Sequence, residues 1–213
     1  MEIKQSSFLA LLSRMDRVVR WNKSRPSLKE NLNDHSLHVA FICLLIGIKR
    51  KQLNVQPYID PYELAMFGAF HDCSEALSED INGRYKKVNK ATHRLFKIIE
   101  ADACDNLIHS LPDEFQDELK LLLRQDLADK TIKDLVKAAD ILHALTKIGA
   151  ELGAGCQDFA HAKIEQTNMI QRYLDEYPEV KYVYDHFIQN FSCTFDELID
   201  QLPERNELPE GIE

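Results

Sequence analysis

Apolar residues recur at helical spacing along almost the whole chain, whereas strict alternation of apolar and polar residues is hard to find. Only seven glycines and seven prolines interrupt the 213 residues. The pattern predicts an all-α fold, and no internal repeat or shift in composition indicates a second domain. We therefore expect one helical domain over residues 1–200 and an acidic, frayed tail over residues 201–213.

Capping signals predict where several helices begin and end. Asp60-Pro61-Tyr62-Glu63 places an acidic N-cap before a proline and a third-position glutamate, which predicts a helix running into His71-Asp72. An earlier helix, marked by an apolar stripe from Phe8, is expected to end near Arg20-Trp21. The next should start after an N-cap at Asn33 or Asp34 and run to about residue 51. We expect a polar loop over residues 78–89, then helices at roughly 91–110, 113–128, 131–152, 158–177 and 180–191.

Charge and targeting signals narrow the possible partners. The chain has 26 Lys plus Arg against 35 Asp plus Glu, a formal net charge of −9. Such a surface repels a nucleic-acid polymer, but a small anionic substrate needs only a local basic pocket.

Five scattered cysteines without a CxxC pair indicate reduced thiols. The amino terminus lacks the apolar core of a signal peptide, and the apolar run over residues 39–48 is too short to span a bilayer. We expect a cytoplasmic protein with no membrane contact.

Four polar residues stand in apolar surroundings, where they are costly. His35 lies in the first turn of an apolar helix, His71 and Asp72 end another, and Asp140 has small and aliphatic neighbours. Each could be structural by itself, and Asp140 could simply pair with a Lys or Arg. As an ordered set on different helices, they predict one shared divalent metal ion.

Two imidazoles and two carboxylates suit Mn²⁺, Fe²⁺, Co²⁺, Ni²⁺ or Zn²⁺ better than Mg²⁺ or Ca²⁺. Four protein ligands on an octahedral ion leave two positions for water and a substrate oxygen. A metal in this position lowers the pKa of bound water and polarises a phosphoryl oxygen.

The ordered set H…HD…D resembles the signature of the HD superfamily of metal phosphohydrolases, and the flanking residues resemble the YfbR-type 5′-deoxynucleotidases. The resemblance extends from about residue 6 to residue 160. The matching segments are Ser6-Ser7-Phe8, Leu12-Ser13-Arg14, Arg20-Trp21, Glu30-Asn31, Asp34-His35-Ser36-Leu37, Val39-Ala40, His71-Asp72, Ser74-Glu75, Asp80, Leu135-Val136-Lys137 and Ala139-Asp140.

The resemblance implies a homodimeric HD-type helical bundle that removes the 5′-phosphate of deoxyribonucleoside monophosphates with one divalent transition metal. It implies that Glu75 is the catalytic carboxylate and that Arg20, Trp21 and Asp80 form the substrate pocket, with Asp80 also aiding catalysis. The implied metal ligands are His35, His71, Asp72 and Asp140.

The residues themselves agree with several of these roles. Glu75 follows Asp72 by three positions, so a continuing helix would place it on the metal-facing side, where it could orient or deprotonate the attacking water. Asp80 could reach the leaving 5′-oxygen or fix the sugar, and a plain loop aspartate is the alternative. Arg20 is suited to bind phosphate in a bidentate manner, or it complements the helix dipole. Trp21, the single tryptophan, could pack against the sugar and exclude a 2′-hydroxyl, or belong to the core.

One segment departs from the family, and two functional alternatives stay open. After Asp80 the chain continues Ile-Asn-Gly-Arg-Tyr-Lys where the family tends to have a Pro-Thr-Pro-like loop. The resemblance therefore predicts the reaction type more closely than the substrate preference. Arg84 and Lys86 could contact a longer phosphate chain, and His143 could support a metal ligand. The alternatives are an HD-type deoxynucleoside triphosphate hydrolase and a catalytically silent nucleotide-sensing protein.

Overall fold

The computed structural model describes residues 5–203, and the all-α prediction is confirmed there. A single isolated bridge between Val19 and Asn31 is the β pairing found among these residues. Short 3₁₀ turns cover Ser13–Arg17, Gln125–Leu127, Gln157–Phe159 and Gln189–Ser192. The α-helices are α1 (Phe8–Leu12), α2 (Leu32–Gln52), α3 (Pro61–Phe70), α4 (Glu75–Ser78), α5 (Gly83–Lys86), α6 (Lys90–His109), α7 (Asp113–Leu123), α8 (Lys130–Gly153), α9 (Ala160–Glu176), α10 (Pro178–Phe187) and α11 (Phe195–Asp200).

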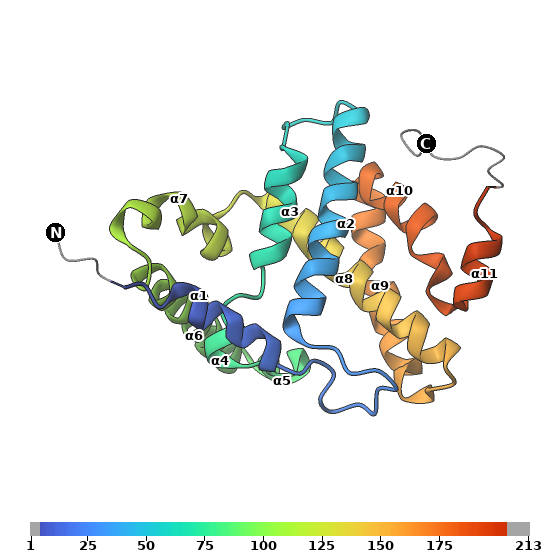
Figure 1. The fold of residues 1–213 in the computed structure, drawn as a ribbon, viewed down its shortest axis with the longest axis horizontal. Helices are drawn as coiled ribbons and strands as arrows, with labels where there is room; N and C mark the ends of the chain where they lie inside the picture. The colour runs from blue at the N-terminus through green and yellow to red at the C-terminus, as the bar shows by residue number, and fades with distance from the viewer. Residues whose placement is uncertain (1–4, 204–213) are drawn as a thin grey trace, which may run out of the picture.

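Helices α2, α3 and α8 form the centre of the molecule (Figure 1). The larger apolar core joins these three helices to α9 and α10, with fully buried side chains such as Ile46, Leu64 and Leu142. A second core lies under α1, α4, α6 and α7 and includes Leu32, Cys73 and Leu107. The start of α2 and the end of α3 therefore lie where the two cores meet.

Helices α2 and α3 pack antiparallel at very short range, and two glycines make the approach possible. A Cβ atom at Gly47 would lie 2.7 Å from the Pro61 Cα, and one at Gly68 would lie 3.0 Å from the Ala40 Cα. Both helices have side-chain caps: Asn31 accepts from the Asp34 amide at 2.9 Å, and Asp60 accepts from the Tyr62 and Glu63 amides. The Asp60 N-cap is as predicted, whereas an N-cap at Asn33 or Asp34 is wrong by two or three residues.

The predicted continuous helix from Phe8 to about Trp21 is wrong. Helix α1 ends at Leu12, a 3₁₀ turn follows, and the chain is extended at Val18. The Leu32 amide donates to the Val18 carbonyl and the Arg20 amide donates to the Glu30 carbonyl, both at 3.0 Å. This pairing with the segment before α2 takes the backbone groups that a longer helix would use, so a tertiary contact overrides the local preference.

Two further boundaries differ from the sequence prediction. The segment expected as a loop over residues 78–89 contains α5, whose amide at Arg84 donates to the Asn82 side chain. Helix α11 was not predicted, although Thr194 and Glu197 form a capping box, a pattern that the sequence does contain. Residues 204–213 of the predicted tail lie outside the described range. No helix within residues 5–203 is long and apolar enough to cross a membrane.

Candidate metal and phosphate site

The four residues singled out by the sequence converge, although they come from three separate helical regions. His35 lies in the first turn of α2, His71 and Asp72 directly follow α3, and Asp140 lies in the middle of α8. The Nε2 atom of His35 is 3.1 Å from His71 Nε2, 3.6 Å from Asp72 Oδ2 and 3.4 Å from Asp140 Oδ1. Three of them, His35, His71 and Asp72, each offer a ligand atom within 4.8 Å of the others.

Hydrogen bonding and charge at these side chains fit a cation. His71 Nδ1 lies 2.8 Å from the Gly68 carbonyl, which can only accept, so this nitrogen carries the proton and Nε2 points inward. Burial lowers the pKa of His35 to about 4, so this ring is neutral at neutral pH. Two ligand atoms about 2.1 Å from one metal ion lie about 3 Å apart when adjacent, which is the observed spacing of the two Nε2 atoms.

The surrounding carboxylates favour positive charge at this point. Burial lowers the pKa of His71, but Asp72, whose Oδ2 lies 3.0 Å from His71 Nε2, outweighs it and raises that pKa above its ordinary value. In turn, burial acts to raise the pKa of Asp72, and attraction to His71 holds it well below its usual range. Asp140 is held low as well, against the effect of burial, by Lys137, whose Nζ is 2.6 Å from Oδ2.

Arg20 lies beside the same carboxylates. Its Nε donates to Glu30 Oε1 at 3.1 Å, and its Nη1 donates to Asp72 Oδ2 at 3.3 Å. Burial acts to lower the pKa of Arg20, but the attraction of Asp72, Asp140 and Glu30 raises it, so the guanidinium stays charged. A permanent cation next to the candidate metal ligands is suited to binding an anionic group of a substrate.

Glu75 is a buried carboxylate at the start of α4, three positions after Asp72 in the chain. A turn over residues 71–74 separates α3 from α4, so the helix does not continue from His71 to Glu75. The Oε1 atom of Glu75 accepts a hydrogen bond from Lys86 Nζ at 3.1 Å, whereas its buried Oε2 atom has no hydrogen-bond partner among the described residues. Burial raises the pKa of Glu75 to about 8, aided by the negative charges of Asp72 and Asp80. A carboxylate of this kind can exchange a proton near neutral pH.

Asp80 lies within the electrostatic influence of Arg20 and Asp72, and Trp21 follows Arg20 directly in the chain. Burial raises the pKa of Asp80, against the attraction of Arg20. Trp21 adopts a positive φ of 55°, an unfavourable backbone conformation for a bulky residue, and such strain is frequent at functional sites. Its ring lies 5.2 Å from that of Phe159, which is fully buried at the start of α9.

Sequence patterns assign no role to Glu30 or Lys137, and they suggest His143 only as a supporting side chain. Glu30 belongs to the Glu30-Asn31 segment that resembles the family, but its pairing with Arg20 depends on the contact between residues 18–20 and 30–32. The cations Arg84 and Lys86, considered above as phosphate contacts, already pair with carboxylates: Arg84 with Glu165, and Lys86 with Glu75 and Glu100.

The helical bundle and the convergent His, His-Asp and Asp side chains define a protein of the HD-domain class. Two solved structures share the fold. An HD-domain phosphohydrolase from Listeria innocua has a TM-score of 0.75 and 19% identity, and the match covers 89% of this chain and 90% of that chain. The HD phosphohydrolase DatZ of cyanophage S-2L, bound to dA and one catalytic Zn²⁺ ion, has a TM-score of 0.62 and 19% identity, and the match covers 89% of this chain and 99% of that chain. At this identity the likeness shows the fold alone.

Sequence comparison identifies the family within that class. Residues 7–191 match the model of the 5′-deoxynucleotidase YfbR-like family. A 5′-deoxynucleotidase of Photobacterium profundum is 36% identical over 197 residues, covering 92% of this chain and all of that protein. One from Vibrio atlanticus is 35% identical over 199 residues, again covering 92% of this chain and all of its own length. The chain belongs to the 5′-deoxynucleotidase YfbR-like family.

Proposed function

We propose that this chain is a 5′-deoxynucleotidase that hydrolyses the 5′-phosphate of deoxyribonucleoside monophosphates to give the deoxyribonucleoside and phosphate. The observation that carries the proposal is the convergence of His35, His71, Asp72 and Asp140, with the charged Arg20 beside them. The names of the relatives, which are 31–36% identical over at least nine-tenths of the chain, support the same reaction.

In this proposal the four side chains hold one divalent transition metal, and Zn²⁺, Co²⁺, Mn²⁺, Fe²⁺ and Ni²⁺ all suit the N/O ligand set. When bound, such an ion supplies Lewis-acid polarisation of a phosphoryl oxygen and makes a nearby water molecule more acidic. The DatZ structure, which contains a catalytic Zn²⁺, supports a metal in a protein of this fold.

Four further side chains bind the substrate or transfer protons. Arg20 binds the phosphoryl oxygens and stabilises their charge in the transition state. Glu75 accepts a proton from the attacking water, for which a pKa near the working pH is well suited. Asp80, whose pKa burial raises, provides a proton or a hydrogen bond to the departing 5′-oxygen. Trp21 packs against the sugar and leaves no room for a 2′-hydroxyl.

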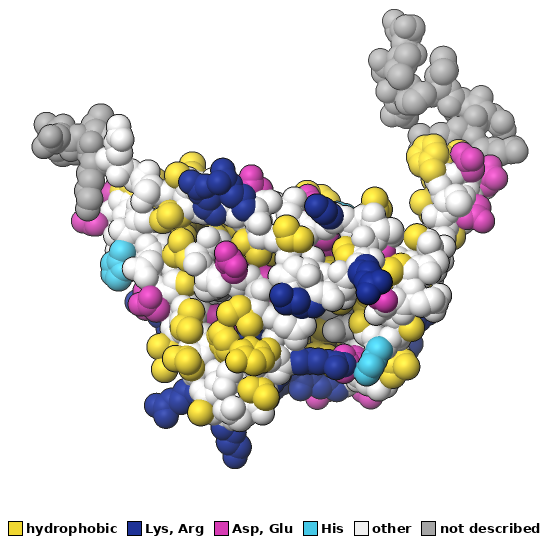
Figure 2. Space-filling view, turned by 90° about the horizontal axis from the view of Figure 1, so that it is seen from below, with side chains coloured by type: hydrophobic (Ala, Val, Ile, Leu, Met, Phe, Trp, Pro, Cys, Tyr) yellow, Lys and Arg dark blue, Asp and Glu magenta, His cyan; other side chains and the backbone are white. Residues whose placement is uncertain are grey.

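The substrate is small, so no extended basic surface is needed. In the face shown in Figure 2, basic and acidic side chains are interspersed, and no continuous basic surface covers the coloured part. The formal net charge of −9 supports a mononucleotide and not a nucleic-acid polymer as the substrate. We also propose, from the family resemblance, that the protein is a homodimer, which light scattering after size-exclusion chromatography would test.

The decisive experiment measures phosphate release from dAMP, dTMP, AMP and dATP with metal-stripped protein to which Co²⁺ or Mn²⁺ is added back. We expect metal-dependent release from dAMP and dTMP, with AMP spared. Asp72→Ala should abolish metal binding and turnover while the helical circular dichroism is unchanged, and Asp185→Ala, an exposed aspartate of α10, should behave like the wild type. Turnover of dATP alone would contradict the monophosphate substrate, and full activity of Asp72→Ala would contradict the site.

A further inference from the structure

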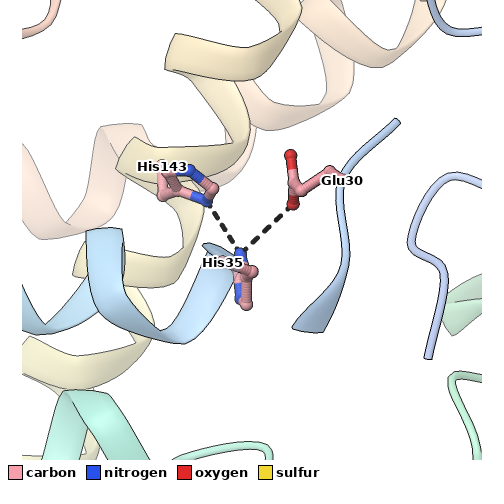
Figure 3. A group of neighbouring side chains, drawn as sticks. All are labelled: Glu30, His35 and His143. Atoms are coloured by element: carbon pink, nitrogen blue, oxygen red, sulfur yellow. Dashed lines mark hydrogen bonds and ion pairs between the residues drawn. The ribbon is translucent and has the colours of Figure 1, made fainter. Parts of the chain in front are cut away.

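His35 is the most deeply buried of the four candidate ligands, and both of its ring nitrogens have partners in the interior. The side chain is fully buried, with 0% exposed. Its Nε2 faces His71, Asp72 and Asp140. Its Nδ1 faces the other way, 2.8 Å from His143 Nδ1 and 3.6 Å from Glu30 Oε1 (Figure 3). The ring is therefore held from two sides, by the candidate ligands at Nε2 and by His143 and Glu30 at Nδ1.

The position of the single proton on a neutral His35 ring decides whether it can bind a metal. A metal ion needs an unprotonated nitrogen, so the proton must be on Nδ1 if Nε2 is the ligand. At 2.8 Å, His143 Nδ1 is the hydrogen-bond acceptor for that proton, and the Glu30 carboxylate lies beyond hydrogen-bond distance at 3.6 Å. An acceptor at this place favours the tautomer that presents Nε2 to the metal site.

The structure also holds His143 itself in place. It lies on α8, three residues after Asp140, so one helix supplies both a ligand and the partner of another ligand. The ring of His38 stacks on His143 with centroids 5.0 Å apart and planes 19° apart. The side chain is 6% exposed, so water cannot readily replace it as the acceptor.

We propose that His143 is the positioning residue of the metal centre: it accepts the Nδ1 proton of His35, fixes the tautomer of that ring and thereby strengthens metal binding. The inference rests on the metal site of the proposed function. Glu30 has a secondary part, because its negative charge lies near the Nδ1 proton while its Oε1 also binds Arg20. Hydrogen-bond partners of metal-binding histidines commonly change metal affinity 10–100-fold.

A different reading of the same side chains is a second metal ion held by Glu30, His35 and His143, whose ligand atoms lie within 4.8 Å of one another. A neutral imidazole has one lone pair available for coordination, so His35 would have to lose its last proton to bind two ions at once. That requirement favours a hydrogen bond on this side of His35 and one ion per chain on the other.

The test measures Co²⁺ affinity and stoichiometry in metal-stripped protein, by competition with a chelating dye and by the visible absorption of bound Co²⁺. His143→Phe keeps a ring of similar volume but removes the acceptor, and we expect it to bind one Co²⁺ about 10- to 100-fold more weakly, with an altered spectrum. His143→Gln, whose side-chain oxygen can accept, should recover part of the affinity. Glu30→Gln should weaken binding less than His143→Phe. His93→Phe, at an exposed position of α6, is the matched control and should bind as the wild type does.

Three other outcomes of these measurements would overturn the proposal. Wild-type affinity in His143→Phe would show that the acceptor is not needed, and a larger loss in Glu30→Gln would transfer the role to Glu30. Two Co²⁺ ions per wild-type chain, reduced to one in His143→Phe, would establish the second-ion reading. If circular dichroism shows that His143→Phe does not fold, the Co²⁺ affinities of His143→Gln and Glu30→Gln are compared instead. Weaker binding by His143→Gln than by Glu30→Gln would support the proposal, and the reverse order would contradict it. Metal binding by a wild type that releases no phosphate would refute the proposed function and leave this inference standing.

Discussion

Replacing Glu75 with glutamine should make the metal-free protein more stable in alkaline solution, although it should abolish turnover. The residue is 5% exposed, and its Oε2 atom has no hydrogen-bond partner among the described residues. Burial raises its pKa from 4.5 to about 8, which means that the folded protein disfavours the charged form. Functional residues often reduce stability in this way, because the geometry that suits the reaction does not suit the folded chain.

The sign and size of the effect follow from the two pKa values. Because the folded pKa lies above the unfolded one, the wild type loses stability as pH rises from 4.5 to about 8 and no more above that. At about 1.4 kcal/mol for each pH unit, the loss is about 4 to 5 kcal/mol. A glutamine does not titrate, but its buried amide protons can lack acceptors, which costs about 1 to 2 kcal/mol. We expect Glu75→Gln to gain about 3 kcal/mol above pH 8 and to show no gain near pH 4.5.

The assay is thermal unfolding of the chelator-treated protein at pH 5 and at pH 9. For a chain of this length, 3 kcal/mol corresponds to a rise in Tm of about 6 to 12 °C at pH 9. The control is Glu118→Gln, an exposed glutamate of α7, whose Tm should differ little from that of the wild type at either pH. The reasoning would be refuted if Glu75→Gln and the wild type differed in Tm by the same amount at both pH values. That result would mean that burial does not raise the pKa of the Glu75 carboxyl group.

Three other substitutions test separate parts of the structure. Trp21→Ala should bring the rates for AMP and dAMP close together, and an unchanged preference for dAMP would exclude a role in sugar recognition. Arg50→Ala should cost about 3 to 5 kcal/mol in urea denaturation because it leaves the buried Glu179 without its ion-pair partner, and a loss below about 1 kcal/mol would contradict this. Gly47→Ala should destabilise the protein by about 1 to 3 kcal/mol, since the new Cβ would lie 2.7 Å from the Pro61 Cα; Gly83→Ala, with nothing within 4 Å, is the control.

The sequence by itself determined the helical class and most of the long helices. Helical spacing of apolar residues is a local property, and so are the signals around Asp60 that begin α3. It also singled out the candidate ligands, because His35, His71, Asp72 and Asp140 are polar residues in apolar surroundings and occur in an order that resembles the HD signature.

The tertiary structure alone decided how the first segment of the chain reaches the site. Local pattern predicts helix up to Arg20, but backbone pairing with residues 30–32 makes the segment extended and places Arg20 against Glu30 and Asp72. In the same way, only packing brings His143 of α8 against His35 of α2, which lies 108 positions earlier. Such contacts join residues far apart in the chain, and no local spacing encodes them. The sequence could therefore suggest His143 as a supporting side chain, but only the tertiary structure shows that it contacts the candidate ligand His35.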